Sequence, residues 1–218
     1  MPCLNEGATI EMCVREALRI IKILDVNGEV IVVDNASTDD SAVKAKKAGA
    51  RVVYEPRRGY GRAIRSGIRA AIGEVIVILD ADMTYDFSDI PKVYQPLRLG
   101  ICDMVVGDRF AGGMERGAMS VLHRIGVKIL SLIGRLKFDT DVMDFHCGLR
   151  GITRAKAEKL HFETDGMEFA TEMIAEAARN NLRIGQVRVR LLRCRYNRVS
   201  KLRTFRDGFR HLIYMLQL

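Results

Sequence analysis

Apolar runs of strand character alternate with amphipathic helical stretches through the first half of the chain. The strand-like runs lie at 29–34, 51–55, 74–80 and 103–107, and the helical patterns lie at 7–24, 39–48, 61–72 and 88–99. Repeated alternation of this kind is typical of βα units and a parallel sheet. The runs at 30–33 and 75–79 are apolar throughout, as expected of central strands covered on both faces. The pattern predicts an α/β fold with a mostly parallel central sheet flanked by helices.

The pattern changes after residue 110. A glycine-rich loop at 107–117 leads to a helix expected near 118–136, and a later segment at 187–195 begins with the alternation of an edge strand. Helical spacing gives the expected helix an apolar side and a basic side. The apolar side carries Leu122, Ile125, Ile129, Leu132 and Ile133, and the basic side carries Arg124, Lys128, Ser131 and Arg135. The basic side is either a functional anion-binding face or a solvated surface, and the pattern leaves both open.

Both ends of the chain are unusual. The segment at 2–6 has the character of a loop that follows a strand, yet no strand precedes the helix at 7–24. We therefore expect the main domain, residues 1–202, to lack a first parallel strand. Residues 203–218 predict a basic amphipathic helix, which either lies on a membrane surface or packs on the domain. We also expect the natural polypeptide to continue from there into membrane-spanning helices.

Composition narrows the function classes. A chain of 218 residues with 48% hydrophobic positions suits one domain with a tail, and its net charge of +8 favours an anionic partner such as nucleic acid, an acidic membrane surface or a phosphorylated small molecule. The five cysteines are scattered, which argues against a disulfide framework or a zinc site and favours a reducing compartment. The sequence has no apolar run of roughly 18 residues and no signal peptide. We expect a cytoplasmic protein that is peripheral to, or anchored at, a membrane.

Two carboxylates end the most apolar strand. Asp80 and Asp82 follow the run at 75–79, and Asp34 ends the run at 30–33. The carboxyl edge of an open α/β sheet is where ligands bind. Two acids one residue apart can hold Mg²⁺ or Mn²⁺, which commonly bridges substrate phosphates. Two such acids without further context more often lie in a solvated turn. The other motifs of the sequence must therefore show whether these two bind a metal.

An ordered set of motifs supplies that context. The motifs are PCLNE at 2–6, VVDNASTDDS at 32–41, GYGRAIRSGIRAA at 59–71, LDAD at 79–82, VGDR at 106–109, DFHCGLR at 144–150 and RYNRVSK at 195–201. Together they resemble the family 2 glycosyltransferases, most closely their polyprenol-phosphate branch, which includes dolichol-phosphate mannosyltransferases. The resemblance covers nearly the whole chain. It implies a nucleotide-diphospho-sugar transferase (GT-A type) fold, with residues 1–202 as the catalytic domain.

The resemblance implies a donor site at the strand ends. Its residues would be Pro2, Leu4, Asn5, Glu6, Asp34, Asp80, Ala81 and Asp82. Within this set Asp80 and Asp82 would be catalytic and would bind the metal, Mg²⁺ or Mn²⁺. Two departures from the family pattern bear on this site. Asn35 replaces a common aspartate, and Thr84 replaces a glutamine that can help to hold the metal in relatives.

The resemblance also implies an acceptor-phosphate site formed by Arg109, Arg124, Arg198, Ser200 and Lys201, with Arg109 counted as catalytic. Arginine suits this role because its planar donors bind two phosphate oxygens. Asp144 and Arg150 would support the site.

Other candidate residues receive no catalytic assignment. A Cys/His nucleophile at His146 and Cys147 is disfavoured, because adjacent residues rarely point at each other productively. Glu168 and Glu172 share a helix face and either orient arginines or face water. The sequence-separated His123, His161 and His211 suggest no metal cluster.

These expectations combine into one reaction. The chain would be an inverting hexosyltransferase that moves a sugar from a UDP- or GDP-hexose to a polyprenyl or dolichyl phosphate at the cytoplasmic face of a membrane. The enzyme alternative is transfer to a sugar hydroxyl of a glycan or lipid-linked saccharide. A basic RNA-binding module is a remote alternative, because the 6% of aromatic residues are not interleaved with the basic clusters. We therefore expect a nucleotide sugar, a polyprenyl phosphate and a membrane surface as partners, and no nucleic acid.

Overall fold

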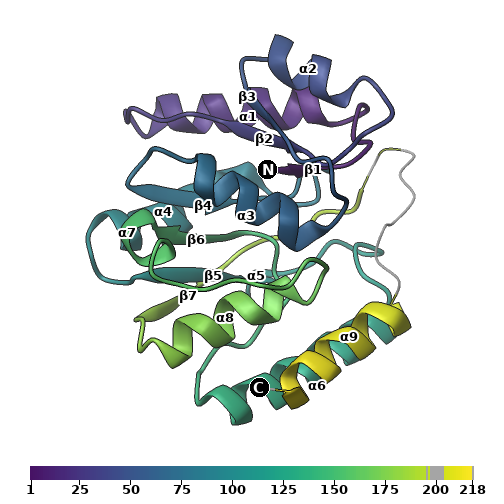
Figure 1. Cartoon of the computed structure of the whole chain (residues 1–218), viewed down its shortest axis with the longest axis vertical. Helices are drawn as coiled ribbons and strands as arrows, with labels where there is room; N and C mark the ends of the chain where they lie inside the picture. Colours follow the sequence, from purple (N-terminus) through teal and green to yellow (C-terminus); the bar gives the residue numbers. More distant parts are fainter. Residues whose placement is uncertain (195, 197–203, 218) are drawn as a thin grey trace.

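A computed structural model describes residues 1–194, 196 and 204–217, with the side chains of 204–207 left out. Within these described residues, seven strands form two sheets. The first is parallel, in the order β1 (Pro2–Cys3), β2 (Ile31–Asp34), β3 (Arg51–Tyr54). The second is mixed, in the order β4 (Val75–Ile78), β6 (Arg150–Thr153), β5 (Met104–Asp108), β7 (Ile184–Arg188). Figure 1 shows β1 lying between β2 and β4, where the two sheets meet.

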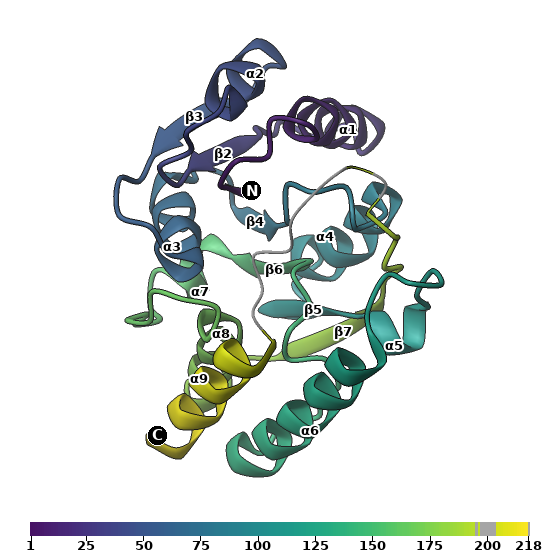
Figure 2. The ribbon, with the colours of Figure 1, turned by 90° about the vertical axis from the view of Figure 1, so that its right-hand side faces the viewer.

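Helices cover both faces of the sheets. In Figure 2, α3 and α8 lie on one side, and α1 and α4 lie on the other. The longer helices are α1 (Ile10–Ile23), α2 (Ser41–Lys47), α3 (Tyr60–Ala70), α4 (Ile90–Arg98), α6 (Val121–Phe138), α8 (Phe169–Arg179) and α9 (Thr204–Gln217). The short ones are η1 (Phe87–Asp89), α5 (Arg109–Gly112) and α7 (Arg154–Ala157). The layered arrangement confirms the α/β class.

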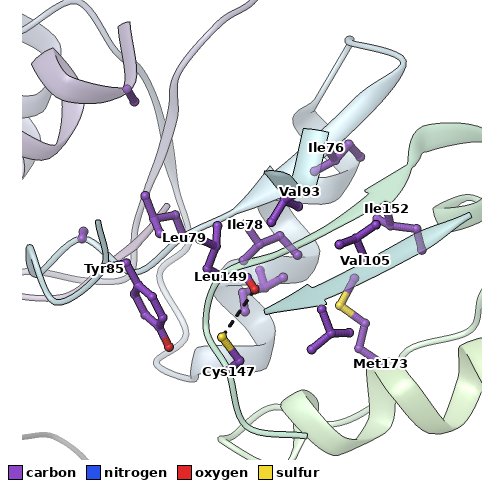
Figure 3. Close-up of a cluster of buried hydrophobic side chains, with 14 of the residues drawn as sticks. Ile76, Ile78, Leu79, Tyr85, Val93, Val105, Cys147, Leu149, Ile152 and Met173 are labelled. Atoms are coloured by element: carbon purple, nitrogen blue, oxygen red, sulfur yellow. Dashed lines mark hydrogen bonds between the residues drawn. The ribbon is translucent and has the colours of Figure 1, made fainter. Parts of the chain in front are cut away.

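The core lies where the mixed sheet packs between α4 and α8. Val105 and Ile152 are fully buried in neighbouring strands, and Val93 of α4 and Met173 of α8 cover them from opposite sides (Figure 3). Leu149 leads into β6 from the loop that also carries Cys147. The core therefore holds the ends of β4 and β6 rigid, which matters because both strands run to the site described below.

Three strands differ from the sequence expectation. Pro2–Cys3, expected as a loop with no strand before the helix at 7–24, forms the short strand β1, which pairs in parallel with β2. The antiparallel strand β6 was not expected, because its segment RGIT carries an arginine and a glycine in place of an apolar run. The edge strand expected at 187–195 is wrong in its bounds. It is β7, which pairs with β5 along Ile184–Arg188 and ends where the Arg190 amide donates to the Asp89 carboxylate instead. Leu191 then bridges to Tyr85 and Met114 beside the site.

The helix expected near 118–136 turns its apolar stripe outward. α6 packs on the domain through its buried residues Val127, Ser131 and Gly134, and the Phe145 ring lies directly against Gly134. Ser131, expected on the basic side, is buried and accepts a hydrogen bond from the Phe145 amide. The exposed side chains are Val121, Leu122, Ile125, Ile129, Leu132 and Leu136. The helix therefore presents apolar residues to its surroundings.

α9 lies beside α6 in both views (Figures 1 and 2). His211 and Met215 of α9 are buried, whereas Phe209 and Leu216 are largely exposed. The domain contact expected as one alternative for the C-terminal helix is thus present. Across the part of the chain that the structure describes, every helix is too short or too polar to cross a membrane.

Candidate active site

The carboxyl ends of β1, β2 and β4 bring the expected donor residues to one edge of the sheets. The loop after β1 is tied to the loop after β2, because the Thr38 amide donates to Asn5 Oδ1 (2.7 Å) and the Glu6 amide donates to Ser41 Oγ (2.9 Å). Asn5 adopts a positive φ of 52°, which a short polar side chain tolerates. Asp34, at the end of β2, is buried and accepts from the Ser37 amide.

Thr9 joins this loop pair to the acids after β4. Its hydroxyl donates to the Ala81 carbonyl (2.8 Å) and contacts the Glu6 carbonyl (3.3 Å). Ala81 is buried and lies between the two acids. The donor positions Glu6 and Ala81, which are 75 residues apart in the chain, are thus held by a single side chain.

Asp80 and Asp82 differ in their surroundings. Asp80 accepts from the Tyr60 hydroxyl (3.2 Å), and burial raises the pKa of Tyr60 well above its ordinary value, so this phenol stays protonated and can donate. Asp82 is buried, and its Oδ1 accepts from the amide (3.0 Å) and the hydroxyl (2.5 Å) of Thr84. Thr84 therefore orients Asp82 through a tight turn.

The loop before β6 forms another wall of the site. The Gly148 amide donates to the Tyr85 hydroxyl (2.7 Å), and a Cβ on Gly148 would overlap the Asp80 carboxylate. Arg150 stabilises this loop through hydrogen bonds to backbone carbonyl groups. Its buried guanidinium donates to the carbonyls of Phe145 and Cys147 and to that of Ala170 in α8.

Arg109 and Asp144 form a buried ion pair. Arg109 Nε lies 2.6 Å from Asp144 Oδ2, and Nη2 lies 2.7 Å from Oδ1, so the pair is bidentate. Both side chains are buried, and the carboxylate raises the pKa of Arg109 against the cost of desolvation. The Arg109 Nη1 atom lies outside this bidentate contact. The role of Arg109 at an acceptor phosphate stays a prediction.

The other acceptor residues are placed only in part. Arg124 is exposed on the first turns of α6, one residue after His123, whose pKa is lowered by burial and by the nearby Arg109. Arg198, Ser200 and Lys201 fall outside the described residues. Asn35, the first departure from the family pattern, is buried and bridges backbone groups of Glu55, Arg57 and Gly59.

The sequence did not predict a contact between two histidines. His146 Nε2 lies 3.3 Å from His211 Nδ1, which also lies 2.8 Å from the Thr171 hydroxyl, although the histidines are 65 residues apart. Burial lowers the pKa of His146 well below its ordinary value. Nothing local in the sequence predicts this contact, because its partner lies in a helix 65 residues later. The contact ties α9 to the loop at 144–148.

The structure also shows the surroundings of Cys147, the disfavoured nucleophile, and of the two glutamates Glu168 and Glu172. Burial raises the pKa of Cys147 to about 12, which disfavours a thiolate, and its Sγ contacts the Leu149 carbonyl. Glu168 pairs with Arg210 (2.7 Å), one of the two expected outcomes. Glu172 instead accepts from the Glu163 and Thr164 amides and so stabilises a loop.

The donor set at this edge fits a hard divalent cation held jointly with a ligand. Within the described residues, no group of three or more histidine, cysteine, aspartate or glutamate side chains is arranged to bind a metal by itself. Asp80 and Asp82 offer carboxylate oxygens, and Mg²⁺ commonly uses one or two carboxylates with waters and substrate phosphates. The Thr84 hydroxyl donates a hydrogen bond to the Asp82 carboxylate and so helps to orient it.

Comparisons with known proteins agree with this geometry. The low-salt glycan biosynthesis hexosyltransferase Agl6 of Haloferax volcanii is 35% identical over 217 residues, which is 99% of this chain and 52% of the relative. The dolichyl-phosphate hexose transferase of the same organism is 30% identical over 168 residues, covering 77% of this chain and 72% of that protein. The chain spans about half the length of several curated relatives that it matches.

A solved structure is also similar. Glucosyl-3-phosphoglycerate synthase from Mycobacterium tuberculosis, in complex with Mn²⁺ and UDP-glucose, superposes with a TM-score of 0.75 at 25% identity, covering 99% of this chain and 75% of that one. The expected GT-A fold is thereby confirmed. The family model described as "Glycosyl transferase family 2" matches residues 1–161. Its match to most of the chain shows that the chain belongs to glycosyl transferase family 2.

Proposed function

We propose that the chain transfers a hexosyl group, with inversion, from a nucleotide sugar to a polyprenyl or dolichyl phosphate. The observation that carries the proposal is the position of Asp80 and Asp82 at the end of β4, joined through Thr9 to the loop at 2–6. This arrangement suits a nucleotide diphosphate at the carboxyl edge of the sheets.

The donor half of the reaction follows from the strand-end loops. Asn5, Glu6 and Asp34 would surround the nucleotide, since their loops are tied together at this edge. Asp80 and Asp82 would hold Mg²⁺ or Mn²⁺. When bound, such a metal would neutralise charge that develops on the leaving diphosphate. Tyr60 and Thr84 keep the two carboxylates oriented for that purpose.

The acceptor half needs positioning more than proton removal. A phosphate monoester has a second pKa near ~6, so it is largely dianionic and nucleophilic at neutral pH. Arg124 and the segment with Arg198, Ser200 and Lys201 would hold this phosphate. Arg109 would contribute through Nη1 and its charge, while Asp144 fixes its orientation. A phosphate acceptor attacking the anomeric carbon opposite the diphosphate gives inversion.

A membrane surface would deliver the lipid acceptor. The exposed side of α6 combines large apolar residues with the exposed Lys128 and Arg124, a combination that favours an anionic lipid surface. The relative named dolichyl-phosphate hexose transferase supports a lipid phosphate as acceptor. A protein at the cytoplasmic face of a membrane would meet both substrates.

One experiment tests the reaction. The protein is supplied with UDP- and GDP-hexoses, Mg²⁺ or Mn²⁺, and either polyprenyl phosphate or a lipid-linked saccharide that offers only sugar hydroxyls. Mass spectrometry then identifies the product. A hexosyl polyprenyl phosphate supports the proposal, whereas transfer only to a sugar hydroxyl supports the enzyme alternative. Salt-sensitive RNA binding without turnover of any nucleotide sugar would contradict both.

A further inference from the structure

A polar contact in the interior joins α9 to the loop at 144–148. His211 lies on α9, which packs against α6 and α8, and only 5% of this residue is exposed. Its Nδ1 atom lies 3.3 Å from His146 Nε2 and 2.8 Å from the hydroxyl of Thr171, a fully buried residue of α8. The two imidazole rings meet edge to face, with their centroids 4.3 Å apart. Three segments that are remote in the chain therefore meet at one nitrogen atom.

The surroundings of His146 indicate which of its nitrogens carries the hydrogen. Its Nδ1 atom is buried, and no group among the described residues forms a hydrogen bond with it. A buried N–H group without an acceptor is rarer in native proteins than an acceptor without a donor. The hydrogen of neutral His146 is therefore on Nε2, which donates to His211 Nδ1. The Thr171 hydroxyl donates to the same atom, so His211 is a neutral acceptor with its own hydrogen on Nε2.

The backbone of His146 belongs to the loop that orients Arg109. The His146 amide donates to Asp144 Oδ1 (3.3 Å), and the same oxygen accepts from Arg109 Nη2 (2.7 Å). A displacement of His146 would therefore move a group that contacts the carboxylate of the buried ion pair. The side chain of His146 thus connects α9 to the residue expected at the acceptor phosphate.

The other end of this loop lies against the metal-site acids. Gly148 follows His146 by two residues, and its missing side chain leaves the space that the Asp80 carboxylate occupies. The Gly148 amide also donates to the Tyr85 hydroxyl (2.7 Å). One short loop therefore contacts the Arg109 ion pair at its beginning and Asp80 at its end.

We propose that His211 is a positioning residue for hexosyl transfer. As the acceptor for His146, it fixes the loop at 144–148, and through this loop it sets the orientation of Arg109 and the position of Asp80. The proposal rests on the proposed function for what those two residues bind. Transfer requires both substrates in one exact arrangement, so a displaced loop should lower kcat more than it weakens binding of the nucleotide sugar.

Two substitutions of His211 separate the acceptor from the packing. In asparagine the carbonyl oxygen is as many bonds from Cα as Nδ1 is in histidine, so His211→Asn keeps an acceptor, whereas His211→Leu fills the space without one. His211→Leu should lower kcat roughly tenfold or more with little change in the KM for the nucleotide sugar. His211→Asn should recover at least about half of the parental kcat. The rates are measured with whichever acceptor the parent chain uses, so the identity of the acceptor does not affect the comparison.

Met215→Ala is the matched structural control, because Met215 is also buried on α9, one helical turn after His211. It should lower the midpoint of thermal unfolding while leaving kcat nearly unchanged at a temperature where every variant is folded. Equal losses of kcat in Met215→Ala and His211→Leu would overturn the proposal, since docking of the helix would then explain both. A kcat for His211→Asn as low as that of His211→Leu would overturn it too.

Nitrogen-15 NMR tests the arrangement without any turnover. The parent chain at neutral pH should show the hydrogen on Nε2 in both His146 and His211, and the Gly148 amide signal should shift in His211→Leu but not in Met215→Ala. A hydrogen on His211 Nδ1, or an unmoved Gly148 signal in His211→Leu, would overturn the proposal. If His211→Leu fails to fold, the parental spectrum and the kcat of His211→Asn decide. If the parent chain transfers no sugar, the proposed function fails, whereas these spectra still show whether His211 positions the loop.

Discussion

Gly148 lies directly against the carboxylate of Asp80, in a space that any larger residue would invade. The Gly148 amide is held by Tyr85, and Asp80 is held by Tyr60, so neither backbone nor carboxylate can move without breaking a hydrogen bond. The loop before β6 therefore sets the position of an acid that follows β4. The contact joins two segments that are 68 residues apart.

Gly148→Ala should lower transfer activity by roughly tenfold or more, because the added methyl displaces Asp80 from its position for the donor. The matched control is Gly126→Ala in α6, where a Cβ meets nothing within 4 Å. Helix propensity predicts that this control gains up to about 1 kcal/mol of stability. Steady-state kinetics with both variants checks the prediction. Equal activity of the two variants would contradict it.

Asp82→Asn should lower activity roughly 100-fold or more, because the amide cannot supply the charge proposed to face metal and diphosphate. Asp86 gives a matched control, since it also accepts from the amide and hydroxyl of the residue two positions later, Ser88. Asp86→Asn should stay within about twofold of the parent. Activity is measured at saturating Mn²⁺, with circular dichroism to verify folding. Parental activity in Asp82→Asn would remove this residue from the site.

Arg198→Ala should raise the KM for polyprenyl phosphate by about tenfold or more while leaving nucleotide-sugar binding nearly unchanged, because its guanidinium is proposed to hold the acceptor phosphate. Arg154→Ala is the control, since Arg154 lies on α7 and pairs with the exposed Glu158. Initial rates measured while each substrate is varied in turn separate the effects. Comparable losses for both substrates would indicate a donor-side or structural role.

Replacing Ile125 and Ile129 together by serine should weaken binding to anionic liposomes by at least about tenfold, because both side chains are about half exposed on the apolar side of α6. Val43→Ser on α2 removes a similarly exposed apolar side chain elsewhere and should leave binding unchanged. Cosedimentation with liposomes measures the difference. Unchanged binding in the double variant would exclude this side of α6 as the membrane contact.

Acid should destabilise the protein through His146. Burial lowers its pKa in the folded state below 6.5, so the unfolded chain binds the proton more readily. The stability contributed by neutral His146 is complete above about pH 6.5 and is lost as the pH falls toward the folded-state pKa, by up to about 1.4 kcal/mol per pH unit. His146→Gln should therefore show a smaller fall in the unfolding midpoint between pH 7 and pH 5. An unchanged slope in the variant would contradict this.

The local pattern of apolar and polar residues was sufficient to predict most of the parallel strands. The apolar runs around Val32 and Val77 predicted buried strands, and the acids after them predicted the edge proposed to bind the ligand, because strand character and chain direction are local properties. The ordered motifs added the family, which the comparisons confirmed. The same pattern missed β6, whose Arg150 can be buried because its guanidinium donates to carbonyl groups of the preceding loop and of α8.

Tertiary structure decided which side of each element is covered and which distant residues meet. Periodicity showed that Ile125 and Ile129 share a side of α6, but the close approach of Phe145 to Gly134 turned that side outward. The pairing of Arg109 with Asp144 and the contact of His146 with His211 likewise join residues far apart in the chain. Such contacts depend on packing and on the desolvation of charged groups, which a linear pattern does not contain.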